Sequence, residues 1–260
     1  GILEGNLDDA IINVNTDSVF GNFNGTTSSL HSASADFDDI FNTSTGGCVA
    51  AWIYPKSDGG GDYGRIAAKA NATSASDGWS FHVREEASGA VKIKFAIDWS
   101  GSTPAWTTTS RVVPLNAWSH VAVTYTPDDT DADPVIYVNG VSVGAVGAGL
   151  TEDVAPSGSV STDATPDLYI GNNYGAARTF DGYIMDVKIY DATTVTADQV
   201  AGLARKINVD QNDPLIPAVG ASNTGLVGWY PLIADDNDDT AESNDLTPAN
   251  MGSIVYDAFS

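Results

Sequence analysis

The chain has 260 residues, enough for one large β-domain or two small ones. Its 34 acidic residues against 11 basic ones give a formal net charge of −23 at pH 7, so its surface repels nucleic-acid phosphates and anionic membranes. We therefore exclude nucleic acid as a partner. A hydrophobic content of 42% arranged in short runs also excludes a disordered chain.

The single cysteine, Cys48, lies in the apolar run GGCVAAWIYP and has no partner for an internal disulfide. We expect it to be a small buried hydrophobic residue. No stretch approaches the roughly 20 apolar residues of a membrane span, so membrane insertion is not expected. The sequence starts at Gly1 without a signal peptide, which fits a processed product, a fragment or an incomplete sequence.

After an N-terminal segment of residues 1–19, most expected strands show apolar and polar residues in alternation. In VKIKFAIDW, which starts at residue 91, Lys92, Lys94 and Asp98 share the face opposite the apolar residues. GWSFHVREE should pair with this strand across the turn Ala87-Ser88-Gly89. Further strands are expected at 119–126, 167–171 and 182–191.

The most specific local signal is VIYVNGVSVG at residues 135–144. Its Asn139-Gly140 pair accepts positive φ at both central positions of a type I′ turn. Residues 136–138 and 141–143 should therefore form a tight hairpin.

One short helix is expected at residues 196–206. Thr196 can cap its N-terminus, and Gln199 follows at the spacing of a capping box. Its apolar face would comprise Val200, Leu203 and Ile207. We expect this helix to pack against the edge of a sandwich, followed by a connector at 208–224 without periodicity.

Four motifs follow one another along the chain: FNGTTSSLHSAS from residue 23, CVAAWIYP from 48, NAWSHVAVTYTPD with PVIYVNGVSVG from 116, and LYIGNN with FDGYIMDVKIYD from 168. In this order they resemble the laminin G-like domains of the concanavalin A-like lectin/glucanase superfamily. The resemblance covers a domain at residues 20–207. It implies an all-β jelly-roll sandwich of two curved antiparallel sheets.

The resemblance also implies that one strand is displaced. Such domains commonly begin with an apolar strand and an acidic loop, and here the matching segment, LVGWYPLIADDNDDTAESNDLT, lies within residues 225–260. Three explanations are open: closure of the same sandwich in cis, as in a circular permutation; donation to a neighbour in a homo-oligomer; or the start of a second domain. Loss of a central strand would expose unpaired backbone groups, which favours closure in cis.

Catalysis is not expected. Laminarinase-like glycosidases share this fold and use a Glu-x-Asp-x-x-Glu pattern along one strand, and hydrolysis needs two carboxyl groups about 5 to 9 Å apart. The sequence has no such pattern, and the adjacent Glu85 and Glu86 would point to opposite faces of a strand. The Gly-x-Ser-x-Gly motif of serine hydrolases is absent as well.

The acidic loop is the candidate metal site, because the resemblance implies a structural calcium ion where this loop meets the last strand. The candidate ligands, all hard oxygen donors, are Asp235, Asp236, Asp238, Asp239 and Asn244. Thr240 stands where an EF-hand needs Gly, and Met185 stands where relatives carry an acid. A solvated acidic loop is the alternative.

Two loops carry the aromatic and amide side chains with which lectin-like modules hold glycans. The candidate ligand-binding residues are Trp99 and Trp106 in DWSGSTPAW, and Asn172, Asn173, Tyr174 and Arg178 in GNNYGAARTF. An exposed loop tryptophan would form a contact surface. In the alternative, both indoles pack over the edge of the sandwich.

The expected function is therefore a non-catalytic, lectin-like module for carbohydrate recognition or adhesion, extracellular or on a virion surface. Its partners would be glycans on a host particle or cell surface. The alternative is a structural decoration subunit of a larger assembly, such as a phage virion or a bacterial surface layer. A glycosidase-like enzyme is the third and weakest alternative.

Overall fold

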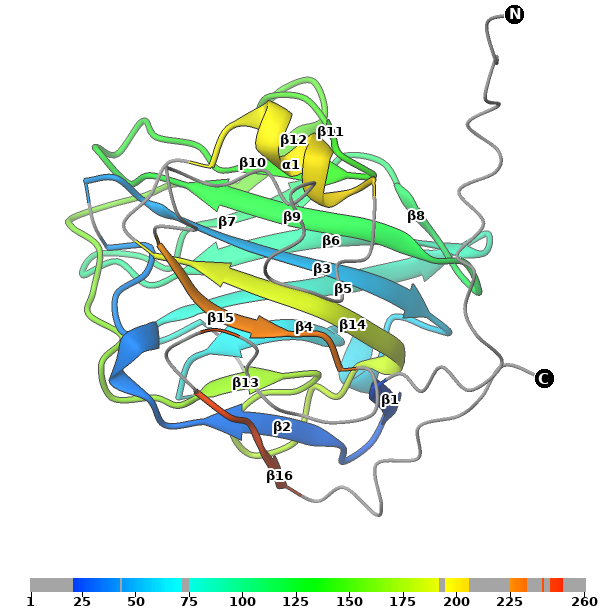
Figure 1. The fold of residues 1–260 in the computed structure, drawn as a ribbon. Helices are drawn as coiled ribbons and strands as arrows, with labels where there is room; N and C mark the ends of the chain where they lie inside the picture. Colours follow the sequence, from blue (N-terminus) through cyan, green and yellow to red (C-terminus); the bar gives the residue numbers. More distant parts are fainter. Residues whose placement is uncertain are drawn as a thin grey trace, which may run out of the picture.

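The computed structural model describes residues 21–42, 44–71, 75–191, 195–205, 225–232, 240 and 244–249. These residues form two antiparallel sheets that face each other, with one short α-helix outside them (Figure 1). The predicted all-β jelly-roll sandwich is thereby confirmed.

We name the two sheets by their place in Figure 1. The front sheet runs in the order β1 (Gly21–Asn24), β14 (Asp181–Tyr190), β3 (Gly47–Pro55), β9 (Ser119–Tyr125), β10 (Val135–Val138) and β11 (Val141–Ser142), and β15 (Leu226–Tyr230) also pairs with β14. The rear sheet runs in the order β12 (Leu150–Val154), β7 (Ala105–Thr108), β6 (Ala90–Ile97), β5 (Trp79–Ala87), β4 (Arg65–Lys69), β13 (Leu168–Ile170), β2 (Ser29–Ser32) and β16 (Thr247–Ala249), and β8 (Val113–Pro114) also pairs with β6. Two short 3-10 helices, η2 (Ala35–Phe37) and η3 (Gly60–Asp62), lie in the loops.

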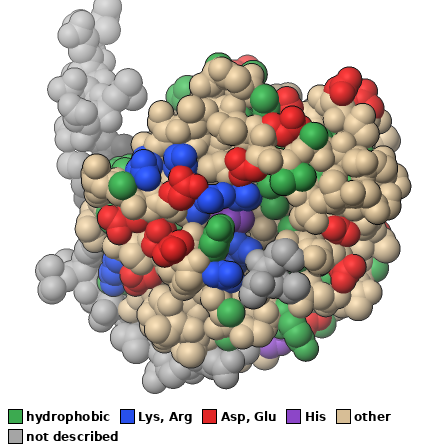
Figure 2. Space-filling view, turned by 180° about the vertical axis from the view of Figure 1, so that it is seen from behind, with side chains coloured by type: hydrophobic (Ala, Val, Ile, Leu, Met, Phe, Trp, Pro, Cys, Tyr) green, Lys and Arg blue, Asp and Glu red, His purple; other side chains and the backbone are tan. Residues whose placement is uncertain are grey.

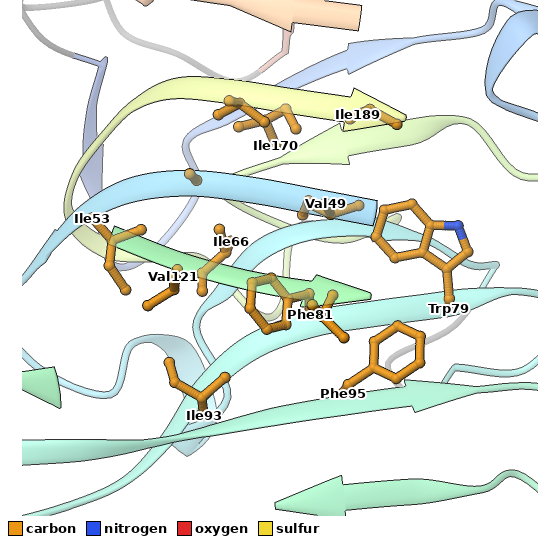
Figure 3. Packing of buried hydrophobic residues seen from close by; sticks show 14 of the residues in the cluster. Val49, Ile53, Ile66, Trp79, Phe81, Ile93, Phe95, Val121, Ile170 and Ile189 are labelled. Atoms are coloured by element: carbon orange, nitrogen blue, oxygen red, sulfur yellow. The ribbon is translucent and has the colours of Figure 1, made fainter. Parts of the chain in front are cut away.

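The hydrophobic core fills the space between the sheets (Figure 3). In β5, Trp79, Phe81 and Val83 are fully buried in this core. Because successive side chains of a strand point to opposite faces, the residues between them point to the outer face of the rear sheet. The same holds for β6, whose Ile93 and Phe95 belong to the core. The polar residues of these two strands therefore share one outer surface.

The predicted hairpin is confirmed. Asn139 and Gly140 have φ angles of 50° and 76°, and Val138 pairs with Val141 across the turn. The second strand ends at Ser142.

The predicted helix is confirmed as α1 (Ala197–Leu203), with the Thr196–Gln199 capping box in place. It covers the outer face of the front sheet beside β11, instead of the sandwich edge alone, because small residues of β3 and β9 leave a shallow apolar surface there. The buried residues of this contact are Cys48, Ala50, Ala122, Tyr137, Tyr190, Val195, Val200 and Leu203. Cys48 is thus the buried hydrophobic residue expected, and burial raises the pKa of its thiol. Ile207 lies outside the described residues.

The displaced segment occupies an edge of each sheet. β1 pairs with residues 181–184 of β14, and β15 pairs with residues 187–190 of the same strand, so the two short strands share one edge (Figure 1). β16 pairs with β2 at the edge of the rear sheet. The expectation of a central strand is therefore wrong, because β3 already pairs with the other side of β14. The pairing within one chain is the arrangement that closure in cis describes.

A buried polar cluster fixes β15. The Asp186 carboxylate accepts a hydrogen bond of 2.7 Å from Nε1 of Trp229 and one from Nζ of Lys188. Lys188 also lies over the Trp229 ring, 5.1 Å from its centroid. Asp186 has a φ of 51° at a register shift between β14 and β3. All three side chains are nearly inaccessible to solvent, so this charge pair is internal to the fold.

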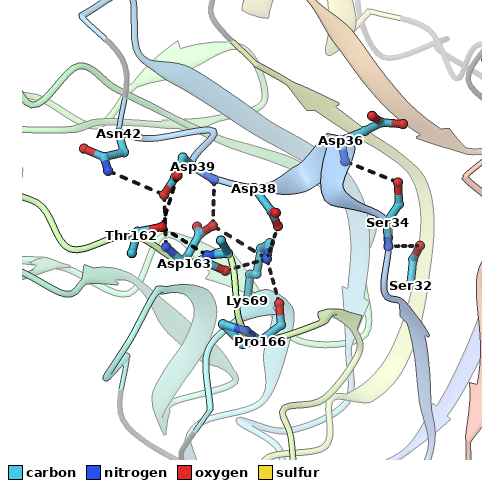
Figure 4. Close-up of polar contacts among 11 residues, drawn as sticks. Ser32, Ser34, Asp36, Asp38, Asp39, Asn42, Lys69, Thr162, Asp163 and Pro166 are labelled. Carbon is cyan, nitrogen blue, oxygen red and sulfur yellow. Dashed lines mark hydrogen bonds and ion pairs between the residues drawn. The ribbon is translucent and has the colours of Figure 1, made fainter.

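A second buried cluster surrounds Lys69 at the end of β4 (Figure 4). Its Nζ donates hydrogen bonds of 2.6 Å to the carbonyl oxygens of Asp163 and Pro166 and forms an ion pair of 2.8 Å with Asp38. Asp39 and Asp163 exchange backbone N–H to carboxylate hydrogen bonds of 2.6 and 3.0 Å. Burial raises the pKa of the Asp163 carboxyl to about 6. The cluster ties the loop at η2 to the loop before β13.

Candidate functional site

A hollow of about 350 Å³ opens on the outer face of the rear sheet, where Figure 2 shows Lys and Arg side chains gathered around a histidine. We call it the cationic cleft. Its lining residues are Tyr63, Arg65, Ala75, Ser80, His82, Lys94, Ala96, Thr103, Ala105, Val154 and Arg178. They come from the adjacent strands β4, β5, β6, β7 and β12 and from the loops beside them.

Positive charge is concentrated on this face. Five of the 11 basic residues of the chain lie in or beside the cleft, although the net charge is −23. They are Arg65, Arg84, Lys92, Lys94 and Arg178. Alternation places those of β5 and β6 together on the outer face.

The loop around η3 holds Arg178 in place. Nη1 of Arg178 donates a hydrogen bond of 2.8 Å to the Gly61 carbonyl, and the backbone N–H of Arg65 donates one of 2.9 Å to the Arg178 carbonyl. Gly61 has a φ of 60°, and a Cβ atom there would collide with the Arg178 guanidinium. The glycine-rich loop is therefore shaped to let this guanidinium approach.

Tyr63 is the aromatic side chain of the cleft. The guanidinium carbons of Arg178 and Arg84 lie 4.9 and 5.2 Å from its ring centroid, within cation–π range. The His82 ring lies 5.8 Å away, tilted by 59°. The ring thus orients both arginines around the hollow.

His82 lies at the centre of these charges. Burial, followed by the charges of four surrounding cations, holds the pKa of its imidazole well below 6.5. Those cations are Arg65, Lys94, Arg84 and Arg178. His82 is therefore neutral near pH 7 and contributes hydrogen bonding instead of charge. Its Nδ1 lies 3.4 Å from the Ser80 hydroxyl.

Arg65 is 3% exposed. Burial, together with the nearby charge of Arg178, lowers the pKa of its guanidinium to about 9. Arg65 is therefore still charged at pH 7, and its guanidinium and that of Arg178 repel each other. Positive potential in the cleft therefore persists at neutral pH.

Two acidic residues lie at the rim. Glu85 forms ion pairs of 2.7 Å with Arg84 and 2.8 Å with Lys92, and its hydrogen bond with Lys92 lowers the pKa of the carboxyl. Asp153 accepts hydrogen bonds of 2.8 Å from Lys94 and 2.6 Å from Thr107. The rim cations are thus partly neutralised by the protein itself.

The lining of the cleft differs from the acidic residues beside it. No residue in the cleft lining is acidic, and within the described ranges no carboxylate forms an ion pair with Arg178. The geometry therefore presents a charged guanidinium, hydroxyl groups and a neutral imidazole to whatever enters.

The structure places the two predicted tryptophans elsewhere. Trp99 is 4% exposed and Trp106 is fully buried, with its Nε1 donating a hydrogen bond of 2.8 Å to Asp133. The Trp106 ring also lies 6.4 Å from Phe95 in the core. Neither indole offers an exposed face. Both tryptophans are packed, as in the alternative given in the sequence analysis. Alternation along β7 directs Trp106 inward.

The predicted loop at 172–178 divides into two parts. Asn172 and Asn173 are buried and bind the loop itself: Asn172 donates to Thr179 at 2.7 Å, and Asn173 accepts from the Ala177 backbone at 3.2 Å. Tyr174 is 58% exposed and packs edge-on against Tyr169, outside the cleft. Of the predicted ligand-binding residues, only Arg178 lines the cationic cleft.

A larger hollow of about 530 Å³ lies among loops at one end of the sandwich. Its lining residues are Asn42, Ser44, Trp99, Pro127, Asp128, Asp129, Thr130, Gly158, Ser159 and Val160. It includes an edge of Trp99, but it lacks the convergence of charged side chains from adjacent strands. We therefore favour the cationic cleft as the functional site.

The metal prediction falls mostly outside the described residues, since these do not include Asp235, Asp236, Asp238 and Asp239. Asn244 is described, and its side-chain amide donates to the Val227 carbonyl at 3.0 Å while its own carbonyl accepts from Tyr230 at 2.7 Å. Asn244 is thus bound to β15. Elsewhere in the described part of the chain, no cluster of three His, Cys, Asp or Glu residues suits a metal ion. Calcium in the loop stays a prediction.

Sequence reasoning did not single out Arg65, His82 or Lys94 as site residues. A usable signal was present, because Ser80, His82 and Arg84 alternate on one face of a strand opposite Lys92 and Lys94 on the next. Arg65 lies beside His82 on the neighbouring strand. The position of Arg178 beside these residues can be seen only in the folded structure.

The family comparison agrees with the observed fold. The family described as "Concanavalin A-like lectin/glucanases superfamily" matches residues 24–201. No curated protein matches the sequence at a significant level. None of the helices in the described part of the chain has the length and apolar character of a membrane span.

Three similar solved structures are distant. A candidate carbohydrate-binding protein from Bacteroides ovatus ATCC 8483 is 19% identical, with a TM-score of 0.48, over 91% of this chain and 61% of that one. The CBM40 of Ruminococcus gnavus IT-sialidase, bound to alpha2,3 sialyllactose, is 10% identical, with a TM-score of 0.45, over 72% and 96%. Full-length tailspike protein 2 of an Escherichia coli O157:H7 bacteriophage is 14% identical, with a TM-score of 0.49, over 83% and 28%. At this level of similarity, the ligands and activities of these proteins cannot be assigned to the present chain.

Proposed function

Since the chain belongs to the concanavalin A-like lectin/glucanases superfamily, we propose that it is a carbohydrate-binding module that holds a glycan in the cationic cleft without cleaving it. The observation that carries this proposal is the convergence of Tyr63, Ser80, His82 and Arg178 on one hollow. An aromatic ring with a few fixed polar groups is the usual composition of a ligand site, and about 350 Å³ lies within the range of such sites.

The proposal of binding without turnover rests on the chemistry of the lining. Most glycoside hydrolases use two carboxyl groups that flank the scissile bond, one with a raised pKa. The lining offers cations, hydroxyl groups, a tyrosine and a neutral histidine instead. At the rim, the Glu85 and Asp153 carboxylates have lowered pKa values and are engaged by lysines, which suits neither for proton donation.

A glycan array followed by calorimetry tests the proposal. Tyr63→Ala removes the ring that orients Arg84 and Arg178, and we expect it to weaken binding of the array hit at least about tenfold. The matched control is Tyr183→Ala, since Tyr183 is a partly exposed tyrosine on β14 of the front sheet, where it packs with Tyr54 at 5.5 Å. We expect the control to bind like the parent chain.

Three outcomes are informative. Loss of binding in the Tyr183 variant alone would place the site on the front sheet and contradict our assignment. Release of reducing sugar from a bound oligosaccharide would overturn binding without turnover. Absence of any glycan ligand, together with self-association of the chain, would favour the alternative role as a decoration subunit of a larger assembly. An exterior location, on a cell or virion surface, follows from glycan recognition and belongs to the same proposal.

A further inference from the structure

The cleft carries more positive charge than the binding of a neutral glycan requires. A neutral sugar is held by hydroxyl, amide and aromatic groups, whereas this cleft gathers cations at the cost of mutual repulsion. Positive charge so concentrated in a chain with a net charge of −23 needs a physical reason. Figure 2 shows the basic side chains around the hollow, with acidic side chains next to some of them.

The basic residues of the cleft differ in their partners. Glu85 and Asp153 pair with the rim cations Arg84, Lys92 and Lys94. Arg178 also lines the hollow, but its Nη1 donates to a neutral carbonyl, that of Gly61, and its Nε is buried without a hydrogen-bond partner among the described residues. A planar guanidinium binds carboxylate or sulfate oxygens in a bidentate manner.

Partial desolvation strengthens such a contact. Lys94 and Arg84 side chains are 15% and 18% exposed, and Arg65 is 3% exposed, so these cations are largely shielded from water. An ion entering it would meet several cations in a medium of lower effective dielectric than water. Neutral His82 adds a hydrogen-bonding group without a charge of its own.

We infer that the ligand of the cationic cleft is an acidic glycan, whose carboxylate or sulfate group binds between Arg178, Arg65 and Lys94. This inference rests on the proposed glycan-binding function and specifies its substrate class. The anionic substituent would bring a negative charge to Arg178 and Arg65, and it would compete with Asp153 for Lys94. Sugar hydroxyl groups would reach Ser80, Thr103 and His82 at the walls.

The test uses matched oligosaccharide pairs that differ only in charge. Oligouronates are compared with their carboxyl-reduced forms, sialyllactose with lactose, and sulfated galactan with its desulfated form, all at 0.15 M salt. At that ionic strength the Debye length is about 8 Å, so the overall negative charge of the chain is largely screened while the cleft contacts are not. We expect the acidic member of at least one pair to bind about 10- to 100-fold more tightly.

Variants locate the effect. Arg178→Met should abolish the preference for the acidic member. Arg178→Lys should retain only part of it, because lysine keeps the charge but lacks the planar guanidinium that binds two oxygens at once. Lys56→Met removes one charge from an exposed lysine that lies 4.3 Å over the Tyr183 ring, away from the cleft, and should leave the preference intact. Asp153→Asn, which removes the carboxylate at Lys94, should strengthen acidic binding. Thermal unfolding shows whether each variant is folded, and Lys94→Met gives a second loss-of-charge variant.

The outcomes separate this inference from the proposed function. Equal affinity for acidic and neutral members, still sensitive to Tyr63→Ala, would overturn the acidic class and leave glycan binding intact. No binding to any member would overturn both. Preference for oligouronates or sialosides over sulfated sugars, or the reverse, identifies the anion as carboxylate or sulfate. Equal losses in the Arg178 and Lys56 variants would show long-range attraction instead of a cleft contact.

Discussion

Two groups of buried cations in this molecule differ in how they are compensated. Lys69 and Lys188 are 1% exposed, and each is held by carboxylate or carbonyl oxygens of the protein. Arg65 is also buried and donates a hydrogen bond of 3.4 Å to the Tyr63 carbonyl, yet its strongest charged neighbour is another cation, Arg178. The first arrangement is that of a structural ion pair, whereas the second raises the energy of the folded protein.

The difference indicates which charges serve the fold and which serve a ligand. A buried cation that donates to several fixed oxygens holds segments together, as Lys69 does for two loops and the Lys188–Asp186 pair does for β15. Cations placed against one another destabilise the fold until an anion arrives, and such unfavourable placement is typical of functional sites. The following predictions test this distinction through stability, from the largest expected effect to the smallest.

Lys188→Met should have the largest effect. It removes the cation from Asp186 and leaves a buried carboxylate with Trp229 as a remaining donor. Breaking one half of a buried ion pair costs about 3–5 kcal/mol of unfolding free energy. Urea unfolding at pH 7 measures the loss, and the matched control Asp186→Asn with Lys188→Met should recover part of it. A loss below about 1 kcal/mol would show that the pair does not fix β15.

Lys69→Met should have the next largest effect. The variant strands two carbonyl oxygens and removes two ion pairs: the longer one, of 3.6 Å, with the buried Asp163, and the one with Asp38, which is 26% exposed and can regain water. We therefore expect a loss of about 2–3 kcal/mol, smaller than for Lys188. Urea unfolding measures it, with Lys56→Met as the exposed-lysine control. Equal stability of the two variants would remove Lys69 from the structural group.

The strands and the helix could be predicted from the sequence because their signals are local. The Asn139-Gly140 turn and the Thr196–Gln199 cap each require only a few adjacent residues, and both are confirmed. The placement of α1 on the outer face could not be predicted in this way. It depends on small side chains of β3 and β9, which only the pairing of those strands brings together.

The candidate site was predicted less well than the fold. The loop sequence predicts Arg178 as a site residue, but it predicts Trp99 and Trp106 only because tryptophans in a Ser- and Gly-containing stretch suggest exposure. Trp106 instead points into the core from β7. This strand has only four residues, so it is too short to be recognised in the sequence from alternating apolar and polar residues. Arg65 and His82 meet because β4 pairs with β5 across a register shift, which no local pattern specifies.

Asp163→Asn tests the Lys69 cluster through pH. The folded pKa of the Asp163 carboxyl is about 6, above its ordinary value of 3.8, so the folded state binds the proton more tightly than the unfolded state. The contribution of this group to stability is therefore fully present below about pH 4 and is lost as pH rises through 6. Relative to Asp163→Asn, which keeps the acceptor for the Asp39 N–H, the parent chain should lose on the order of 1–3 kcal/mol between pH 4 and 7. Urea midpoints at several pH values measure this, and parallel profiles would contradict it.

Arg178→Met should change stability least, by less than about 1 kcal/mol, although we expect it to remove acidic-glycan preference. The variant loses the hydrogen bond to Gly61 and the contact with Tyr63, but it also relieves the repulsion of Arg65. Because salt screens that repulsion, raising NaCl from 0.05 to 0.5 M should stabilise the parent chain more than the variant. Chemical unfolding at both salt concentrations measures the difference. A loss above about 2 kcal/mol would place Arg178 with the structural cations, and the cleft would then owe its charge to the fold and not to a ligand.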